Sequence, residues 1–442
     1  MVDDNKQWLA KGESVSKKPK NGVTAWVVAV LALLATILIY MCSKKLNPAM
    51  ASVVEFFGQD TAWGGGLGSI YSVVSAVLLL PLGVLQTKFS PKWLAVIGLT
   101  VLGGGSLLGA LTADPGVFVF GRIIEGVGYC TLAAVGGVLI TRWFDEEHRG
   151  VPMGIFTANV GLGQVIILNS ATFIIPAYGW QGLWLFVAGI AAVIIVLFIF
   201  LVKDWPRGGE LEAKAAAEER AAKNLKKAKF TDTFKVPVLW LMALMFACFG
   251  VGMQGTMMFS NMILTQVAGV DAGTANLMSS LMAVGQMVGP IVGGWVISRV
   301  CAKKKALRGP VVAAMFALAF ICEFSFLAFT NGPGSAWVTS AMMGFLVTLW
   351  APALYMIAAD HSLSPELASV GITVFLFGQQ VGGIVGPYIM GWFNAAFGTF
   401  VAAKWLILGI GIVGTIAAVV CAILDRKFVL AHQKNEVVAI EE

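Results

Sequence analysis

The sequence predicts an all-α membrane protein with twelve transmembrane helices, arranged as two pseudo-symmetric halves of six. Three observations predict this fold: the composition, the number of long apolar runs, and one long polar segment near the middle. Hydrophobic residues make up 58% of the 442-residue chain and charged residues only 12%, about half the charged share that is usual for a soluble protein. Most of the surface is therefore expected to face lipid.

Twelve apolar runs have the length that a transmembrane helix needs, which is about 20 residues. They lie between polar or Gly/Pro breaks, at residues 23–46, 62–86, 92–112, 117–141, 151–176, 181–202, 237–267, 272–298, 308–330, 335–359, 367–392 and 398–424. A polar segment separates the sixth run from the seventh. We therefore expect an N-terminal tail at 1–22, six-helix bundles at 23–202 and 237–425, a linker at 203–236 and a C-terminal tail at 426–442.

Single segments carry further signals, in chain order. The first run, Trp26 to Met50, contains Lys44 and Lys45 side by side near its end. The linker stretch Glu210 to Lys229 is rich in alanine, with acids first and bases last, a pattern that complements the helix dipole. We expect a solvated connecting helix there, with a partner-binding helix as the alternative.

The two halves echo each other. Ser69 to Gly83, at the end of the second run, resembles Ser280 to Gly294 at the end of the eighth. Glycines seven residues apart open the fifth and eleventh runs at the same offset of a little over 210 residues. Repeated halves are common in membrane transporters.

Lysine and arginine predict the orientation, because cytoplasmic loops carry the excess of both. With the N-terminus inside, the inner segments hold all but four of the 30 basic residues; the exceptions are Lys44, Lys45, Arg122 and Lys404. The polar start and the lack of a small-residue cleavage site argue against a removed signal peptide. We expect a multi-pass protein of the cell (inner) membrane, surrounded by lipid, with both termini in the cytoplasm.

Enzyme chemistry is not indicated. The three histidines are far apart, no nucleophile and base accompany them, and no phosphate-binding G-x-x-x-x-G-K-[ST] loop is present. The six cysteines lie singly without metal-ligand spacing. We expect no cofactor, no metal and no nucleic-acid partner.

The stretch R-I-I-E-G-V-G, Arg122 to Gly128, resembles the R-x-x-x-G-x-G signature of the major facilitator superfamily. The loop from Arg142 to Gly154 is similar to that superfamily's loop between spans 4 and 5. The turn from Gly83 to Lys92 matches the family's G-x-L-a-D-R-x-G-R-K only in part, because Thr87 replaces the acid. Through this resemblance, the candidates for motif and gating roles are Gly83, Lys88, Gly126, Gly128, Arg142, Arg149, Gly294 and Arg299.

Charged side chains inside the spans are costly and therefore candidates for function. Lys44, Lys45 and Arg122 suit an anionic substrate. Glu125 lies one helical turn from Arg122, on the same face. The resemblance implies that this arginine is tied to proton transfer and that Glu125 titrates; the alternative is an internal ion pair that neutralises itself. Glu323 in the ninth run is the second candidate for proton coupling.

Uncharged polar residues complete the predicted substrate site. The resemblance implies that spans 1, 2, 4, 5, 7, 8, 10 and 11 line the transport path. The candidates on those spans are Tyr71, Gln164, Gln254, Tyr355 and Gln379. The alternative for each is a hydrogen bond between helices.

The expected function is secondary transport by alternating access, with a small organic anion as substrate, most simply a carboxylate, and protons as the coupling ion. We expect a monomer. One alternative is a drug or metabolite exporter of the same fold, for which the methionine-rich seventh run would line an adaptable pocket. The alternative of another class is a membrane receptor or sensor that transports nothing.

The depth of the lysine pair follows from helix length. From Trp26 to Lys44 a helix advances about 27 Å, close to the roughly 30 Å thickness of the hydrocarbon core. A straight span would thus place both lysines near the outer interface, whereas tilt and the longer first helix that the resemblance implies would bring Lys44 to the cavity mouth. Neighbouring residues point about 100° apart on a helix, so one lysine at most would face inward.

Overall fold

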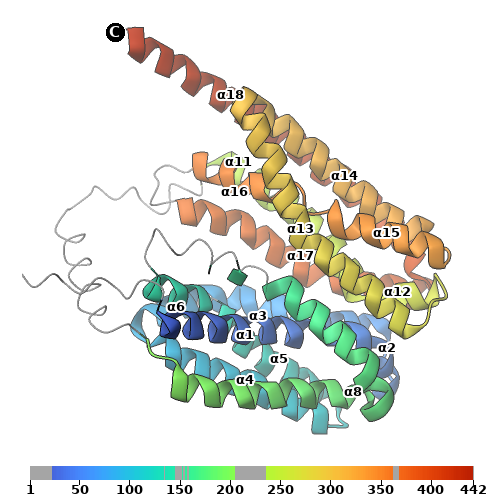
Figure 1. Ribbon diagram of the computed structural model, residues 1–442. Helices are drawn as coiled ribbons and strands as arrows, with labels where there is room; N and C mark the ends of the chain where they lie inside the picture. The colour runs from blue at the N-terminus through green and yellow to red at the C-terminus, as the bar shows by residue number, and fades with distance from the viewer. Residues whose placement is uncertain are drawn as a thin grey trace, which may run out of the picture.

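Two groups of helices lie side by side in the computed structural model (Figure 1). The structure describes residues 22–133, 135–144, 152, 155–156, 159–204, 235–361 and 368–441, and all regular secondary structure in these ranges is helical. Helices α1 to α8 form the N-terminal half and α11 to α18 the C-terminal half. Within the described residues, seven helical segments are long and apolar enough to cross a membrane on their own.

The N-terminal half follows the first six apolar runs. The first is α1 with α2, the fourth is α5 with α6, and α8 contains both the fifth and the sixth, separated by a non-helical Gly179. The helices are α1 (Val23–Lys44), α2 (Leu46–Phe56), α3 (Thr61–Lys88), α4 (Pro91–Leu111), α5 (Pro115–Ala133), α6 (Val135–Trp143) and α8 (Asn159–Leu201).

The C-terminal half follows the last six runs. Its seventh run is α11 with α12, and its tenth is broken by turns at residues 346–350 between α15 and α16. The helices are α11 (Pro237–Met258), α12 (Ser260–Gln266), α13 (Ala272–Lys304), α14 (Arg308–Phe329), α15 (Pro333–Phe345), α16 (Ala351–Asp360), α17 (Ala368–Phe397) and α18 (Lys404–Glu441).

Asp271 accepts hydrogen bonds from Thr274 at the start of α13, and these bonds lower the pKa of Asp271. The linker helix predicted at 210–229 lies outside the described residues.

The first span extends beyond the apolar run predicted at residues 23–46, and this extension sets the depth of the lysine pair. Lys44 ends α1, and after Lys45 the chain continues as α2 to Phe56, which adds about 16 Å at 1.5 Å per residue. The two lysines therefore lie well inside the protein instead of near the outer interface. Pro48 lies in the first turn of α2, where a missing N–H is tolerated.

The two halves repeat the same turns. In the N-terminal half, Gly58 and Gly179 have φ values of 60° and 67°; in the C-terminal half, Gly269 and Gly398 have 68° and 66°. Other residues rarely adopt this left-handed conformation, so glycine suits these turns. Each pair is separated by a little over 210 residues, the offset found in the sequence.

Each half is also tied together at the end opposite to these turns. In the N-terminal half, Asp204 after α8 accepts hydrogen bonds from Ser90 and from the backbone N–H of Lys92, at the start of α4. In the C-terminal half, Arg308 at the start of α14 binds Asp425 of α18 at 2.6 Å. Arg308 is buried. Equivalent spans are thus joined by polar contacts within each half.

The halves meet tightly at the end that contains the glycine turns, which we call the closed end. Asn47 of α2 donates hydrogen bonds to Met257 O (2.9 Å) and Ser260 Oγ (3.0 Å). Thr61 Oγ1 donates to Gly391 O at 2.9 Å. Uncharged side chains make these contacts, so they join the halves without charge pairing. In Figure 1, α2 and α12 lie at this end, on the right.

Replacing Gly65 with alanine is expected to weaken this closure. A Cβ atom on Gly65 would lie 2.2 Å from the carbonyl oxygen of Pro387 in α17, and backbone atoms cannot move aside cheaply. Gly66 is the matched control, because nothing lies within 4 Å of its Cβ position and alanine favours helix by about 1 kcal/mol over glycine. We expect the melting temperature to fall in Gly65→Ala but not in Gly66→Ala. Equal values in the two variants would contradict the contact.

Candidate functional site

A cavity of about 650 Å³ lies between the two halves. Its described lining comes from α1, α3, α5, α8, α11, α13 and α17, together with Thr348. The lining is rich in hydrogen-bonding groups, mostly amides and hydroxyls. Lys44 is the one charged side chain among the lining residues that the structure describes.

Lys44 has no counter-ion in the described part of the chain. It is the last residue of α1 and is half-buried, and its ammonium group makes no hydrogen bond or ion pair with another described residue. A cation removed from bulk water without a partner is costly. An anion bound in the cavity would offset that cost.

Lys45 points to the other side of the helix and is fully buried. Its Nζ donates to Glu125 Oε1 at 2.6 Å and to Ser106 Oγ at 2.7 Å. The same ammonium group lies 4.5 Å from the ring centroid of Trp184 in α8, a favourable cation–π distance. Adjacent lysines therefore have different environments, one in the cavity and one behind it.

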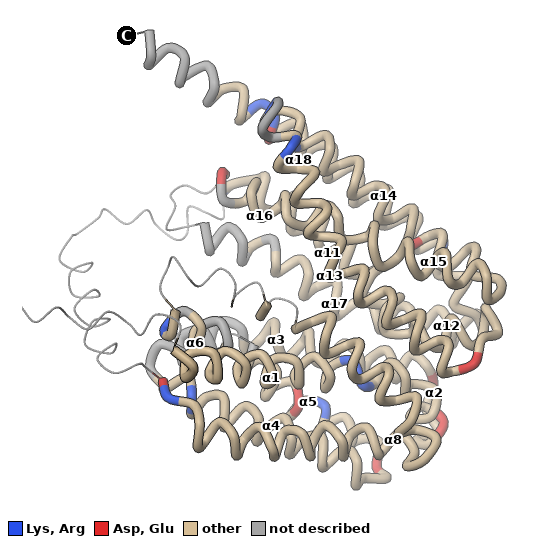
Figure 2. The backbone as a smooth tube through the Cα atoms, in the orientation of Figure 1, with Lys and Arg blue, Asp and Glu red and all other residues tan. Residues whose placement is uncertain are grey.

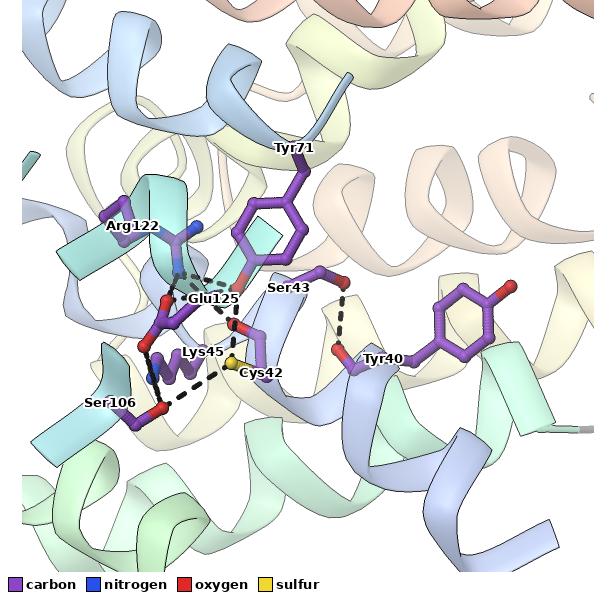
Figure 3. A network of polar contacts seen from close by, with 8 residues as sticks. All are labelled: Tyr40, Cys42, Ser43, Lys45, Tyr71, Ser106, Arg122 and Glu125. Carbon is purple, nitrogen blue, oxygen red and sulfur yellow. Dashed lines mark hydrogen bonds and ion pairs between the residues drawn. The ribbon is translucent and has the colours of Figure 1, made fainter. Parts of the chain in front are cut away.

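Arg122 and Glu125 of α5 complete this buried group, and we call Lys45, Arg122 and Glu125 the ion cluster (Figure 3). Arg122 Nη1 donates to Glu125 Oε2 at 2.7 Å. All three residues are at most 1% exposed, and none lines the cavity. The predicted Arg122–Glu125 ion pair is present, and Lys45 is a third member of it, so the cluster holds two basic groups and one acid.

Tyr71 of α3 lies between the cavity and the ion cluster. Its Oη donates to Glu125 Oε2 at 3.0 Å and accepts from Arg122 Nη1 at 3.3 Å. The guanidinium of Arg122 is 4.5 Å from the Tyr71 ring centroid. Tyr71 is also a lining residue of the cavity. Figure 3 shows its hydroxyl directed at the cluster.

The glutamines of the lining offer amide groups to a ligand. Gln164 of α8 is 2% exposed, and its Nε2 has no hydrogen-bond partner within the described structure. A buried unpaired donor is unfavourable unless a ligand or water satisfies it. Gln254 and Gln379, both predicted from sequence, line the cavity as well. Tyr355 does not: it lies on α16, is 42% exposed and is outside the lining.

Sequence reasoning missed several contributors. Tyr40 and Tyr129 line the cavity, with ring centroids 5.8 Å apart, while Ser106 and Trp184 contact the ion cluster. A helical spacing of four could have found the tyrosines, since Tyr40 precedes Lys44 and Tyr129 follows Glu125 by one turn. No local signal marks Ser106 or Trp184, because their partners are distant in sequence.

Glu323 of α14 lies apart from the cavity. It is fully buried, and neither carboxyl oxygen has a hydrogen-bond partner among the described residues. A Cβ atom on Gly252 of α11 would lie 2.0 Å from Glu323 Oε2, so the glycine makes room for the acid. Met253 and Gln254 of the same helix line the cavity. Glu323 therefore sits one helix behind the cavity wall.

The motif glycines of α5 permit close helix packing. A Cβ on Gly126 would lie 3.2 Å from Val74 of α3, and one on Gly128 would lie 2.7 Å from Gly98 O of α4. Small residues at such contacts are typical of membrane helices. The helix α5 that carries Arg122 and Glu125 is thereby held against both neighbours.

The remaining predicted gating residues are dispersed. Arg299 is exposed near the end of α13, 4.5 Å from the Trp295 ring. Gly83 and Lys88 belong to α3, Gly294 to α13, and Arg142 to the last turn of α6. Arg149 lies outside the described residues. Across the residues searched, no group of three or more His, Cys, Asp and Glu residues could hold a metal ion.

Figure 2 shows where the charged residues lie along the whole described backbone. Long stretches of helix carry no charge, while a few charged positions lie within the N-terminal half. Charged groups in such surroundings are rare because desolvation is expensive. The concentration of charge around one cavity is typical of a transport pathway.

Comparison with known proteins agrees with this arrangement. The family model described as Major Facilitator Superfamily matches residues 32–387. The chain is 24% identical over 357 residues to a probable hexose phosphate transport protein of Chlamydia muridarum, covering 75% of this chain and 76% of that protein. It is 22% identical over 427 residues to the D-galactonate transporter of Escherichia coli O6:H1, covering 90% of this chain and 95% of that protein.

Among solved structures, a bacterial homologue of the human lysosomal transporter Spinster, in an inward-facing and unoccupied conformation, has a TM-score of 0.73. The alignment covers 94% of this chain and 98% of that structure's chain at 15% sequence identity. At this identity the similarity shows a shared fold. The family match over most of the chain, the helical architecture and the transporter relatives lead to one conclusion. The chain belongs to the major facilitator superfamily and is a multi-pass membrane transporter, not an enzyme.

Proposed function

We propose that this transporter moves a small organic anion, most simply a carboxylate, by alternating access with proton coupling. The observation that carries the proposal is Lys44. It is the one charged group in the described cavity lining and has no acidic neighbour there. A carboxylate at Lys44 would form a charge-assisted hydrogen bond, which is among the stronger kinds.

The cavity suits a polar substrate of modest size. Its volume of about 650 Å³ falls within the range of roughly 300–1,000 Å³ that is usual for small-ligand sites. Glutamine amides and tyrosine hydroxyls could bind hydroxyl groups on the anion. The galactonate and hexose phosphate named for two relatives are anions that also carry hydroxyls, which supports this substrate class.

We propose Glu125, rather than Glu323, as the coupling carboxyl group. Glu125 is held by two cations next to the cavity, so adding a proton would free both cations and change the charge near the substrate. Glu323 has no charged partner among the described residues and lies behind α11. A change at Glu323 would reach the substrate only through the helix between them.

The expected orientation indicates to which side of the membrane the cavity opens in this conformation. If the termini are cytoplasmic, as the distribution of lysine and arginine predicts, the closed end faces outward and the cavity opens inward. Substrate would then leave or enter the cavity from the cytoplasm in this state. We also propose that one chain suffices, because the cavity is built from its two halves.

The test is transport by purified protein in liposomes. Labelled galactonate serves as the probe, measured once as exchange at equal pH and once as accumulation driven by an acidic outer pH. We expect wild type to show both, Glu125→Gln to keep exchange but lose accumulation, and Glu323→Gln, the matched buried acid, to keep both.

Other outcomes separate the alternatives. Export of a lipophilic cation without saturable anion exchange would favour a drug or metabolite exporter. Saturable anion binding with no transport in either assay would favour a sensor. Loss of accumulation in Glu323→Gln but not in Glu125→Gln would transfer the coupling role to Glu323.

A further inference from the structure

Glu125 has no direct contact with the cavity. Among the described residues, its carboxylate is hydrogen-bonded to Lys45, Ser106, Arg122 and Tyr71. Of these four, only Tyr71 is also a described lining residue of the cavity. Within the described structure, Tyr71 is therefore the link between the space that substrate and water enter and the carboxyl group proposed to titrate.

The surroundings of Tyr71 hold it in this position. Its ring lies against the Arg122 guanidinium on one side and edge-to-face with Tyr129, at a centroid distance of 5.4 Å, on another. Cys42 Sγ lies 3.1 Å from its hydroxyl. Only 7% of Tyr71 is exposed, and the residue both lines the cavity and bonds to the ion cluster through its hydroxyl.

Every described element around Glu125 contributes a defined group. Lys45 and Cys42 come from the first span, Tyr71 from α3 and Arg122 from α5 itself, while α4 contributes the neutral Ser106. Two of these groups are cations and none is a second carboxylate. A net gain of one proton by the cluster must therefore come from outside it.

We propose that Tyr71 relays protons between the cavity and Glu125. A hydronium ion in the cavity gives a proton to Tyr71 Oη while Tyr71 passes its own hydroxyl proton to Glu125 Oε2. Water and a neutral tyrosine remain, and the carboxylate becomes a carboxylic acid. The reverse steps return the proton. The inference rests on the proposed coupling role of Glu125 and assigns Tyr71, predicted from sequence as a substrate ligand, a second task.

The experiment follows the protonation of Glu125 directly, without substrate. Purified protein in nanodiscs is taken through a rapid pH drop, and the infrared band of protonated carboxyl groups is recorded over time. The Glu125 band is the one lost in Glu125→Gln and kept in Glu323→Gln. We expect Tyr71→Phe to slow its appearance by more than about 10-fold, the size of effect that a positioned proton donor supplies.

Two further variants separate a relay from a merely structural role. Tyr355→Phe removes a tyrosine hydroxyl outside the cavity lining and should leave the rate unchanged. Tyr71→Ala removes the ring as well, admits water to Glu125, and should restore a fast rate although it damages packing more than Tyr71→Phe.

Equal rates in wild type and Tyr71→Phe would overturn the relay while leaving coupling through Glu125 intact. Slow rates in both Tyr71→Phe and Tyr71→Ala would overturn it in favour of a packing role. A wild-type protein whose Glu125 band never appears would overturn the coupling proposal and the relay together.

Discussion

Glu125→Ala is expected to destabilise the protein by about 3–5 kcal/mol, the usual cost of removing one partner from a buried ion pair. Glu125 is the carboxylate between Lys45 and Arg122, both at most 1% exposed. Without it, two cations face each other in a site closed to water. The measurement is thermal or denaturant unfolding of the purified protein in detergent.

Glu323→Ala is the matched control, because Glu323 is an equally buried glutamate in the other half. It has no hydrogen-bond partner among the described residues, so its removal leaves no described charge unpaired. We expect a smaller loss of stability there. Adding Lys45→Met to Glu125→Ala should recover part of the loss, since contacting residues couple energetically. Equal melting temperatures for the two glutamate variants, or no recovery in the double variant, would argue against the charge explanation.

Lys44→Ala is expected to weaken anion binding by about 10- to 100-fold, the equivalent of one lost hydrogen bond to a charged group, with little change in stability. Lys45→Ala is expected to do the reverse, because Lys45 binds Glu125 and Ser106 and does not line the cavity. The two variants are thus expected to differ, one losing affinity for the anion and the other losing stability. The measurement is titration calorimetry with galactonate, alongside melting temperatures without ligand.

Lys44→Arg keeps the positive charge and should keep most of the affinity. If Lys44→Ala bound the anion like wild type, the cavity lysine would not be a ligand and the anion proposal would lose its main support. A large drop in melting temperature for Lys44→Ala would instead indicate a structural partner for its ammonium group.

The helical architecture could be predicted because one physical constraint dominates it. Backbone groups in lipid must bond within their own segment, so each span appears as an apolar run of suitable length. The depth of Lys44 and Lys45 could not be predicted from the length of the apolar run alone, because the helix resumes after Lys45 as α2; the longer first helix was implied only by the family resemblance.

The site was predictable as a set of residues but not as an arrangement. Arg122 and Glu125 are one turn apart, so helical spacing predicts their pairing. Lys45 is 80 residues from Glu125 in sequence, and no periodicity reports that contact. Tyr355 shows the opposite error: its span lies on the predicted path, but Tyr355 is not among the residues that line the cavity.

The net positive charge at and beside the cavity should make the conformational equilibrium of this protein sensitive to the membrane voltage. Lys44, Lys45 and Arg122 against Glu125 leave two positive charges in the empty carrier; a bound monovalent anion alone reduces them to one, and a proton on Glu125 restores the second. A charge that crosses the whole field changes in energy by about 2.3 kcal/mol per 100 mV. An interior-negative potential should therefore act more weakly on a carrier that holds the anion alone than on the empty carrier or on one that holds both anion and proton, and draw the latter two toward the state that faces the cytoplasm.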